Sequence, residues 1–577
     1  MPGMNSGLNI DDPTVVAAFR SALLHQGLLA LLVFAVIAAA WAGLRAWRHA
    51  PARTGAGVAG EPAGRLLLVI GLGNLWLFDG FLQAQPKMAV GLPSQVIEPA
   101  AASSPVWVQH LVNWAGSTWS YHPVQAAAAV VWIQVGLGVW ILAAPRGTPS
   151  RLAGLASAGW GLMVWIFGES FGGILAPGLS WLTGAPGAAG VYVAAGVLIA
   201  LPDRAWPSPR LGQLTLAGLG LFLAGMAVLQ AWPGRGSWAG VSHGQPGTLA
   251  GMALSMSITP QPGFLAGWLS SFAGFDEAHG FAVNLFVVAA LAVTGAAFLS
   301  GRPRLIRPVL IGFSLVCLAD WVLVQDLGFL GGIGTDPNTM IPFVLLAAAG
   351  YLGLTRAGPG PAEQPARPAA LVQRAAAASG RSVVALGGVG LIVLGAAPIA
   401  AAQASPDADP ILAQSIAGAS RPADYPAPGF TLAGRHGQAV TMASLRGKAV
   451  VLGFLDPDCT TGCPPIAAQF RQAAQLLSAR AGQVELVGID TSGAGRSAGW
   501  RPGWLLLTGT PAQLRRVWLE YGITAAAVRH NAPVYVIDPA GRVRREFRHD
   551  PGPGAAATTS SFAVLFADAA RQALGTG

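Results

Sequence analysis

The sequence predicts an α-helical polytopic membrane domain of about ten transmembrane helices, followed by an exported α/β domain. Hydrophobic residues make up 53% of the 577 residues and charged residues only 10%, and the mean hydropathy is +0.53. Apolar runs long enough to span a bilayer, about 20 residues each, recur up to the region near residue 400. Beyond that point, strand-like and helix-like patterns alternate as in a soluble layered domain.

Ten apolar segments are expected to cross the membrane. They lie near residues 22–44, 65–84, 123–144, 152–172, 187–202, 211–232, 279–299, 306–327, 338–355 and 382–402. Arginines gather in alternate connecting segments, as between Arg302 and Arg307, and positive residues favour cytoplasmic loops. This asymmetry predicts that both ends of the chain lie outside. The same lipid-flanking arginines explain much of the formal charge of +9, so no nucleic acid is expected as a partner.

The last apolar segment leaves two alternatives open. LGGVGLIVLGAAPIAAAQA resembles an internal signal sequence with small residues where a peptidase could cut, and it is also long enough to stay as an anchor. In both cases the chain that follows is exported. The predicted domains are a polytopic membrane domain over residues 1–402, a linker over residues 403–424 and a C-terminal domain over residues 425–577.

The C-terminal domain alternates predicted strands and helices. AVVLGFL is suited to a buried strand, and the two prolines after the cysteine loop open a helix that ends near Arg480. QVELVGID predicts another strand and PAQLRRVWLEYGI an amphipathic helix. APVYVIDPAGRVRREF predicts two strands joined by a turn, and SFAVLFADAARQAL a closing helix. These elements predict a central sheet covered by helices.

Two of the three cysteines, Cys459 and Cys463, lie in the loop DPDCTTGCPP after the first of these strands. Cys463 precedes the proline that opens the helix, where backbone N–H groups and the helix dipole favour a thiolate. A disulfide requires Cβ atoms about 3.5–4.5 Å apart, whereas a metal held at about 2.3 Å by each sulfur tolerates a wider separation. The spacing permits a redox pair as well as a metal site. Cys317, within a predicted span, is expected to be a small buried residue.

His530 is the candidate third ligand. It stands just before a predicted central strand that could run beside the cysteine strand. Two thiolates and an imidazole suit Cu(I); zinc is also possible but normally takes a fourth ligand. Taken alone, His530 is explained more simply as a polar residue of a loop.

The C-terminal domain resembles the SCO/SenC family, thioredoxin-fold proteins that help to assemble the copper centre of cytochrome c oxidase. The resemblance begins with PAPGFTLAGRHGQAVTMASLRGKAVVLGFLDPDCTTGCPP. It continues through LVGIDTSG, in which Asp490 matches the family's strand-end aspartate, and through GWLLLTGTPAQLRRVWLEYGI and RHNAPVYVIDPAGRVRREF. It covers residues 426–548, about a fifth of the chain. It implies a thioredoxin-like fold for the domain.

The same resemblance implies that Cys459, Cys463 and His530 are copper ligands and that the copper-site subunit of cytochrome c oxidase is the partner. The chain departs from the family in two respects. Thr460 stands where the family usually has a proline after the first cysteine. Familiar members have one membrane anchor, whereas ten spans are predicted here, and the family does not explain the other nine.

Three predicted spans each place an acid near their outer end, before a Gly- and Pro-rich turn. The segments are GNLWLFDGFLQAQPKM, WIFGESFGGILAPG and ADWVLVQDLGFLGGIGTDPNTM, with Asp79, Glu169, Asp320 and also Asp326. The similarity of the second and third segments suggests an internal duplication. Acids at the lipid boundary usually face protein or a wet cavity and bind cations or protons. The alternative, strongest for Asp326, is that the acid reaches the outer surface.

Histidines of the membrane domain also fall mainly on the outer side. They are His25, His110, His122, His243 and His279, accompanied by Met88, Met252, Met256 and Met340. Such a set would suit the capture of copper before its transfer to the C-terminal domain. The alternative is that outer loops simply tolerate histidine and that the methionines pack. No nucleotide-binding motif is present, which argues against an ATP-driven pump.

The sequence thus predicts a multi-pass protein of a bacterial plasma membrane with copper as its cofactor. Its exported domain would pass copper to a respiratory oxidase, acting as a metallochaperone rather than as an enzyme. The runner-up is a membrane-tethered thiol:disulfide oxidoreductase with Cys459 and Cys463 as its catalytic pair. A third possibility is a copper transporter fused to a copper-receiving domain.

Overall fold

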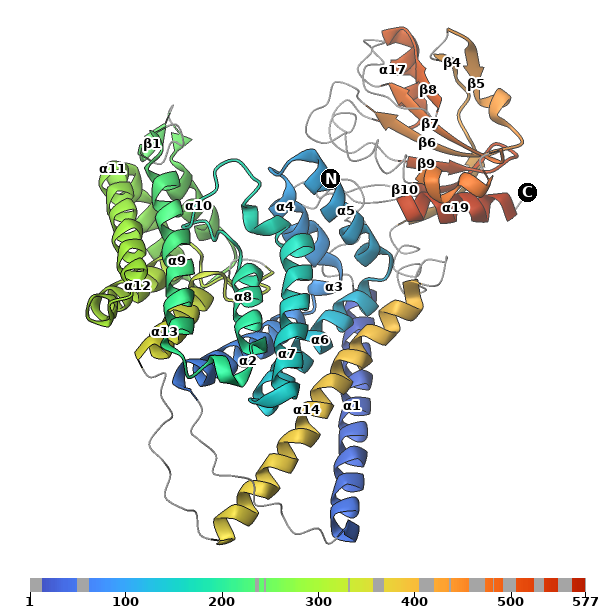
Figure 1. Cartoon of the computed structure of the whole chain (residues 1–577). Coiled ribbons are helices and arrows are strands. Elements are labelled where there is room, and N and C mark those ends of the chain that lie inside the picture. Colours follow the sequence, from blue (N-terminus) through green and yellow to red (C-terminus); the bar gives the residue numbers. More distant parts are fainter. Residues whose placement is uncertain are drawn as a thin grey trace.

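The computed structural model has a helical N-terminal region and a C-terminal region built on one sheet (Figure 1). It describes residues 13–48, 62–233, 238–242, 245–330, 333–355, 368–403, 420–434, 437–455, 473–480, 482–490, 505–523, 534–547 and 563–575.

The N-terminal region is helical apart from a short hairpin of β1 (Val241–Ser242) and β2 (Gln245–Pro246) and its connecting turns. Its helices are α1 (Pro13–Arg48), α2 (Ala63–Gln83), α3 (Met88–Gly91), α4 (Glu98–Ala101), α5 (Val106–Tyr121), α6 (Pro123–Ala143), α7 (Gly147–Met163), α8 (Ala188–Ala200), α9 (Pro209–Ala231), α10 (Thr248–Ser257), α11 (Gly263–Ser300), α12 (Pro303–Leu323), α13 (Met340–Thr355) and α14 (Pro368–Gln403). Two π-helical turns join them, η1 (Leu92–Ile97) between α3 and α4 and η2 (Val164–Gly168) after α7.

Each of the ten predicted spans falls on a helix, but the count of about ten is not confirmed. By length and composition, seven helices of the described chain could cross a membrane: α1, α2, α6, α9, α11, α12 and α14. The other three predicted spans coincide with α7, α8 and α13, which have 17, 13 and 16 residues. These helices are shorter than the roughly 20 residues that a bilayer requires. The seven apolar helices indicate a membrane protein.

Neighbouring helices approach closely through glycines. A Cβ built on Gly154 of α7 would lie 2.6 Å from the carbonyl oxygen of Gly196 in α8, and the reverse distance is 2.8 Å. Gly136 of α6 and Gly388 of α14 face each other in the same way, at 2.6 and 2.8 Å. Small residues at such crossings let helix backbones pack without a side chain between them, as is typical inside membranes.

The C-terminal region contains an eight-stranded mixed sheet with the order β3-β10-β9-β6-β7-β8-β4-β5. The strands are β3 (Ser420–Pro426), β4 (Thr431–Gly434), β5 (Ala439–Thr441), β6 (Ala449–Leu455), β7 (Val484–Asp490), β8 (Leu505–Thr508), β9 (Val534–Ile537) and β10 (Arg542–Phe547). The helices α17 (Pro511–Glu520) and α19 (Ala563–Gly575) accompany them. The predicted strands over 449–455 and 483–490 and the predicted hairpin are therefore confirmed.

The central strand β6 is buried on both faces, which explains its continuous apolar sequence. Val450, Leu452 and Phe454 pack into one core that includes Leu514 and Val517 of α17. Ala449 and Val451 belong to a second core, on the opposite face, with Phe566 and Ala570 of α19. Because side chains alternate along a strand, one strand fills two cores, and its ends are held firmly in place.

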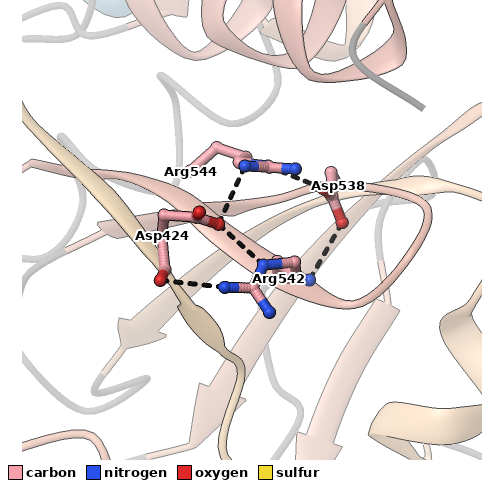
Figure 2. A network of polar contacts seen from close by, with 4 residues as sticks. All are labelled: Asp424, Asp538, Arg542 and Arg544. Atoms are coloured by element: carbon pink, nitrogen blue, oxygen red, sulfur yellow. Dashed lines mark hydrogen bonds and ion pairs between the residues drawn. The ribbon is translucent and has the colours of Figure 1, made fainter.

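The edge strand β3 is attached by ion pairs that link residues far apart in the sequence (Figure 2). Arg542 Nε donates to Asp424 Oδ1 at 2.6 Å, and Arg544 Nη1 donates to the same oxygen at 2.8 Å. Arg544 Nε also donates to Asp538 Oδ2 at 2.7 Å, and the Arg542 backbone N–H donates to Asp538 Oδ1 at 2.9 Å. Strand β3 begins at Ser420, so the sheet takes in the last residues of the predicted linker, 403–424.

The network makes the stability of this domain depend on pH. Burial of Asp538 opposes ionisation, but the hydrogen bonds from Arg542 and Arg544 outweigh it, so the pKa of Asp538 is lowered. A carboxyl with a depressed folded-state pKa stabilises the fold above its unfolded pKa of about 3.9, and this contribution is lost as the pH falls through the folded-state pKa. We expect Asp538→Asn to lower the unfolding free energy at pH 7 by roughly 1.5–3 kcal/mol. Thermal unfolding of the full-length protein in detergent, repeated from pH 7 down to pH 3, measures this.

Asp424→Asn is the matched control for this prediction, because Asp424 binds the same two arginines from an exposed position, with 62% of its side-chain surface accessible. Hydrogen bonding to Arg542 also lowers the pKa of Asp424, but solvent screens exposed pairs. The Asp424 variant should therefore unfold close to the wild type. A gap between wild type and Asp538→Asn that persists unchanged to pH 3 would contradict the assignment.

Candidate functional site

The three predicted copper ligands, Cys459, Cys463 and His530, lie outside the described residues. The strands on either side of them are described, however, and these strands fix where the two ligand segments leave the sheet. Cys317, the remaining cysteine, is a free thiol in α12 and is 1% exposed. This confirms the prediction that it is a small buried residue.

The cysteine segment and the histidine segment start from the same edge of the sheet. Strand β6 ends at Leu455, and the chain continues from there towards Cys459. Strand β9 begins at Val534, directly after the segment that carries His530. Because β6 and β9 are antiparallel, with Leu452 opposite Tyr535, the end of β6 and the start of β9 lie at one edge.

The distances along the chain are short enough for the two segments to meet. Cys459 is four residues beyond Leu455, and His530 is four residues before Val534. An extended chain spans about 3.3–3.6 Å per residue, and paired strands lie about 4.8 Å apart. The register of β6 and β9 is compatible with a site built from the three predicted ligands.

The same edge also carries Asp490, the aspartate singled out in the sequence. It is the last residue of β7 and lies opposite Leu455 in the parallel pairing of β6 and β7. Its side chain is 1% exposed and accepts a hydrogen bond from Thr508 Oγ1 at 3.1 Å. A buried acid therefore lies at the strand end next to the start of the cysteine segment.

An aromatic cluster supports this part of the sheet. The rings of Phe454, Tyr521 and Tyr535 pack together, with centroids 5.1 to 6.4 Å apart. The Tyr535 hydroxyl donates to the Tyr521 carbonyl at 2.6 Å, and the Tyr521 hydroxyl donates to the Pro428 carbonyl at 3.0 Å. Because each hydroxyl is hydrogen-bonded, the rings are held in fixed positions, and they fix the ends of β6 and β9 from which the ligand segments depart.

In the membrane region, two of the predicted acids line one cavity of about 380 Å³. Asp79 of α2 is 2% exposed and accepts a hydrogen bond from the Tyr192 hydroxyl at 3.4 Å. Glu169 follows η2, and its Oε1 accepts the backbone N–H of Ala189 in the first turn of α8 at 3.0 Å. The prediction that these acids face protein or a cavity is confirmed.

The other two predicted acids do not line this cavity. Asp320 is 5% exposed and accepts a hydrogen bond from Gln325 Nε2 at 2.7 Å. Asp326 is fully buried, so the alternative that it reaches the outer surface is wrong. Its backbone has a positive φ of 48°, in the turn that follows α12.

Asp336 is the third acid that lines this cavity, and the sequence pattern does not point to it. It lies in the segment between α12 and α13 and lines the cavity together with Asp79 and Glu169. Its carboxylate accepts the Thr335 hydroxyl at 2.8 Å and the Asn338 backbone N–H at 2.7 Å. In the sequence, Asp336 belongs to an Asp-Pro-Asn turn signal, which gives no indication of a cavity. Its position at the end of the third acid-bearing segment is the one signal that could have revealed it.

The predicted duplication has a structural counterpart in the turns after α7 and α12. Trp165 Nε1 donates to the carbonyl oxygen of Pro186 at 2.6 Å, and Trp321 Nε1 donates to that of Pro337 at 2.7 Å. Each turn also contains a run of residues with positive φ, from Ser170 to Gly173 and from Asp326 to Gly328. Each leads into a short helix, α8 or α13. Glu169 and Asp336 therefore come from two similarly built units.

Among the described residues, the outer histidines do not form a metal site. His25, His110 and His279 are exposed, His122 is buried, and His243 lies outside the described residues. His279 stacks on Phe275, with centroids 4.6 Å apart, at a kink in α11. Within the described ranges, no group of three His, Cys, Asp or Glu residues is placed to hold a metal ion.

Comparisons with known proteins concern the C-terminal domain. Residues 423–546 match the model of the AhpC/TSA family. No curated protein matches the chain. Similar solved structures include copper-bound ScoI from Bradyrhizobium japonicum, with 22% identity, a TM-score of 0.21 and coverage of 26% of this chain and 100% of that one. Copper-bound Sco1 from yeast has 19% identity, a TM-score of 0.22 and coverage of 26% and 95%.

The thioredoxin domain of a thiol-disulfide oxidoreductase from Bacteroides vulgatus is also similar, with 19% identity, a TM-score of 0.18 and coverage of 22% and 90%. The family match and the sheet order, with helices packed against the buried central strand, agree on the fold. The described chain therefore combines a helical region that has seven candidate membrane spans with a thioredoxin-like C-terminal domain.

Proposed function

We propose that the protein is a membrane-anchored copper chaperone whose C-terminal domain binds copper through Cys459, Cys463 and His530. The observation that carries the proposal is the antiparallel pairing of β6 with β9. This pairing puts the end of β6, four residues before Cys459, beside the start of β9, four residues after His530. It supports a shared site for ligands that lie far apart in the sequence.

The residue types suit the metal. Thiolate sulfur and imidazole nitrogen are the donors that Cu(I) prefers, and copper binding requires both thiols deprotonated and the imidazole neutral. In this proposal copper is cargo. A partner thiolate or imidazole would displace these ligands one at a time, so that the ion passes across without being released into water.

The location and the partner belong to the same proposal. The seven apolar helices indicate a membrane protein, and the distribution of arginines favours a C-terminal domain outside a bacterial plasma membrane. An exported copper domain attached to that membrane would be placed beside the outer face of the respiratory complexes. We propose the copper-site subunit of cytochrome c oxidase as the acceptor, in keeping with the resemblance to SCO/SenC proteins.

A thiol:disulfide oxidoreductase is the second candidate function. It is favoured by the thioredoxin-like fold of the domain and by the position of the cysteine pair directly after the central strand β6. Such an enzyme needs one reactive thiolate and a resolving cysteine. It does not need His530, which provides the means of separating the two functions.

We expect His530→Ala to weaken Cu(I) binding by at least about tenfold, because the variant lacks one of three ligands of a soft-metal site. Its ability to reduce a protein disulfide should remain close to that of the wild type. Competition with a chromophoric Cu(I) chelator measures the affinity, and insulin reduction measures thiol exchange, both on the full-length protein in detergent.

His436→Ala is the matched control, because it removes another histidine of the same domain and should leave both activities unchanged. Wild-type copper affinity in His530→Ala would exclude this histidine as a ligand. If disulfide reduction proved fast in the wild type and copper binding weak in both proteins, the oxidoreductase would replace the chaperone as the function.

A further inference from the structure

The cavity beside Asp79 is large, and its lining is mostly apolar, with several aromatic side chains. Its volume of about 380 Å³ lies in the range of small-molecule sites, and α2, α5, α6, α7, α8 and α14 contribute to its walls. The aromatic residues that line it are Trp76, Trp114, Trp119, Trp160, Phe167 and Tyr192. It has no part in the copper proposal, because all three proposed copper ligands belong to the C-terminal domain.

Three acids share this cavity. Asp79, Glu169 and Asp336 all line it, and Asp79 is close enough to the other two to interact with them electrostatically. The described lining residues include no lysine, arginine or histidine. Carboxylates in such surroundings are costly unless a cation or protons accompany them. Three acids without a basic partner among the described lining therefore favour a cationic ligand or protons at this site.

Several buried oxygen atoms at this site lack a hydrogen-bond donor. Oε1 of Gln83, Oε1 of Gln134 and Oε2 of Glu169 are buried and accept no hydrogen bond within the described part of the chain. The two glutamine side chains are well inside the protein, at 4% and 3% exposure. Buried acceptors normally have partners, so a ligand that carries N–H groups would complete the site.

The residues that line the cavity indicate which kind of cation it binds. A metal ion needs several ligands around it, and the described residues offer no group of three His, Cys, Asp or Glu that could hold one. Aromatic faces attract organic cations, and they also bury an apolar body. An aminophospholipid headgroup fits less well, because its phosphate would find no basic residue among the described lining.

A polar route leads to the acids. A second cavity of about 580 Å³ shares Gly168, Glu169, Ala188, Thr335 and Asp336 with the first. A charged ligand could thus reach the carboxylates along a partly polar wall. Glu169 and Asp336 come from the two similarly built turn units, and sites in duplicated membrane proteins commonly form where such units meet.

We propose that this cavity binds a protonated amine carried on a compact apolar body. The ammonium group lies among Asp79, Glu169 and Asp336, where its N–H groups reach the unpaired oxygens, and the apolar body packs against the tryptophans. This is a binding function of the membrane region, and it does not depend on the proposed copper site.

Three adamantane derivatives of one shape test the proposal: the amine, the alcohol and the carboxylate. Isothermal titration calorimetry on the full-length protein in detergent should show binding of the amine and at least about tenfold weaker binding of the neutral and anionic analogues. Asp79→Asn should weaken amine binding by about tenfold or more, since the amide keeps the size of the side chain but removes its charge. Equal affinity for the three compounds would overturn the proposal.

Asp320→Asn is the matched control, because Asp320 is a buried acid of a similar helix end that does not line the cavity; amine affinity should stay within about twofold of the wild type. If Asp79→Asn does not fold, labelling of wild-type Asp79 by a hydrophobic carbodiimide, read by mass spectrometry, provides the second measurement. The amine should slow this labelling, and labelling at an unchanged rate contradicts the proposal. Competition by added phosphatidylethanolamine would assign the ammonium to a lipid headgroup and overturn the assignment to a free amine.

Discussion

A full-length protein in which Cys459 and Cys463 are both replaced by alanine is expected to lose stoichiometric copper binding. The proposed site has three ligands, and the two thiolates are the soft donors that give Cu(I) its high affinity. The imidazole of His530 alone cannot hold the ion against a competing chelator. The measurement is copper per chain by mass spectrometry, after loading with Cu(I) under reducing conditions and dialysis against that chelator.

Cys317→Ala is the control that the chain itself provides. Cys317 is the third cysteine, and it lies buried in α12 with 1% exposure, so its removal should leave the copper content unchanged. Loss of copper in this variant alone would place the metal in the membrane region. Full copper content in the double variant would refute the proposed site, whatever the state of His530.

The strands that could be predicted from the sequence have either a continuous apolar run, as in β6 and β7, or a turn signal between them, as in β9 and β10. Strand β6 was predicted because every side chain from Ala449 to Phe454, apart from a glycine, is apolar, and two cores require this. Strand β3 was missed because SRPADYP contains two prolines and no apolar run. What holds β3 is its backbone pairing with β10, which also brings Asp424 to arginines 118 and 120 residues away. No local pattern contains that information.

The candidate site residues also divide into those that a local sequence pattern predicts and those that only the fold brings together. An acid inside an apolar run is visible in a sequence, so Asp79 and Glu169 could be predicted as cavity residues, and the structure confirms this. That Asp336 joins them, whereas Asp320 does not, depends on how the turn after α12 folds back. The proposed site of Cys463 and His530 likewise rests on the antiparallel register of β6 and β9, which the sequence alone does not supply.

Gly172→Ala is expected to destabilise the membrane region by about 3 kcal/mol or more. Gly172 has a φ of 60° in the turn after η2, and a Cβ built there would overlap the carbonyl group of Pro186. The atoms in the way belong to the backbone of Pro186 and Gly187, so no flexible side chain can move aside. The change would push this turn away from the start of α8, where Glu169 accepts the Ala189 N–H. Thermal unfolding in detergent should show a lower midpoint, and amine binding in the cavity should weaken with it.

The stability lost in Gly172→Ala could come from an alanine at positive φ or from the contact with Pro186. Gly173→Ala separates these two causes. Gly173 also has a left-handed backbone, with a φ of 72°, but a Cβ there meets nothing within 4 Å. Its replacement carries only the conformational cost of an alanine at positive φ, about 1–2 kcal/mol. If both variants lost the same stability, the cost would lie in the backbone and not in the contact with Pro186. If Gly172→Ala loses more stability than Gly173→Ala, the close approach of this turn to Pro186 positions Glu169. Gly328 approaches Pro337 in the same way in the second unit, so its replacement by alanine should destabilise the turn beside Asp336 to a similar extent.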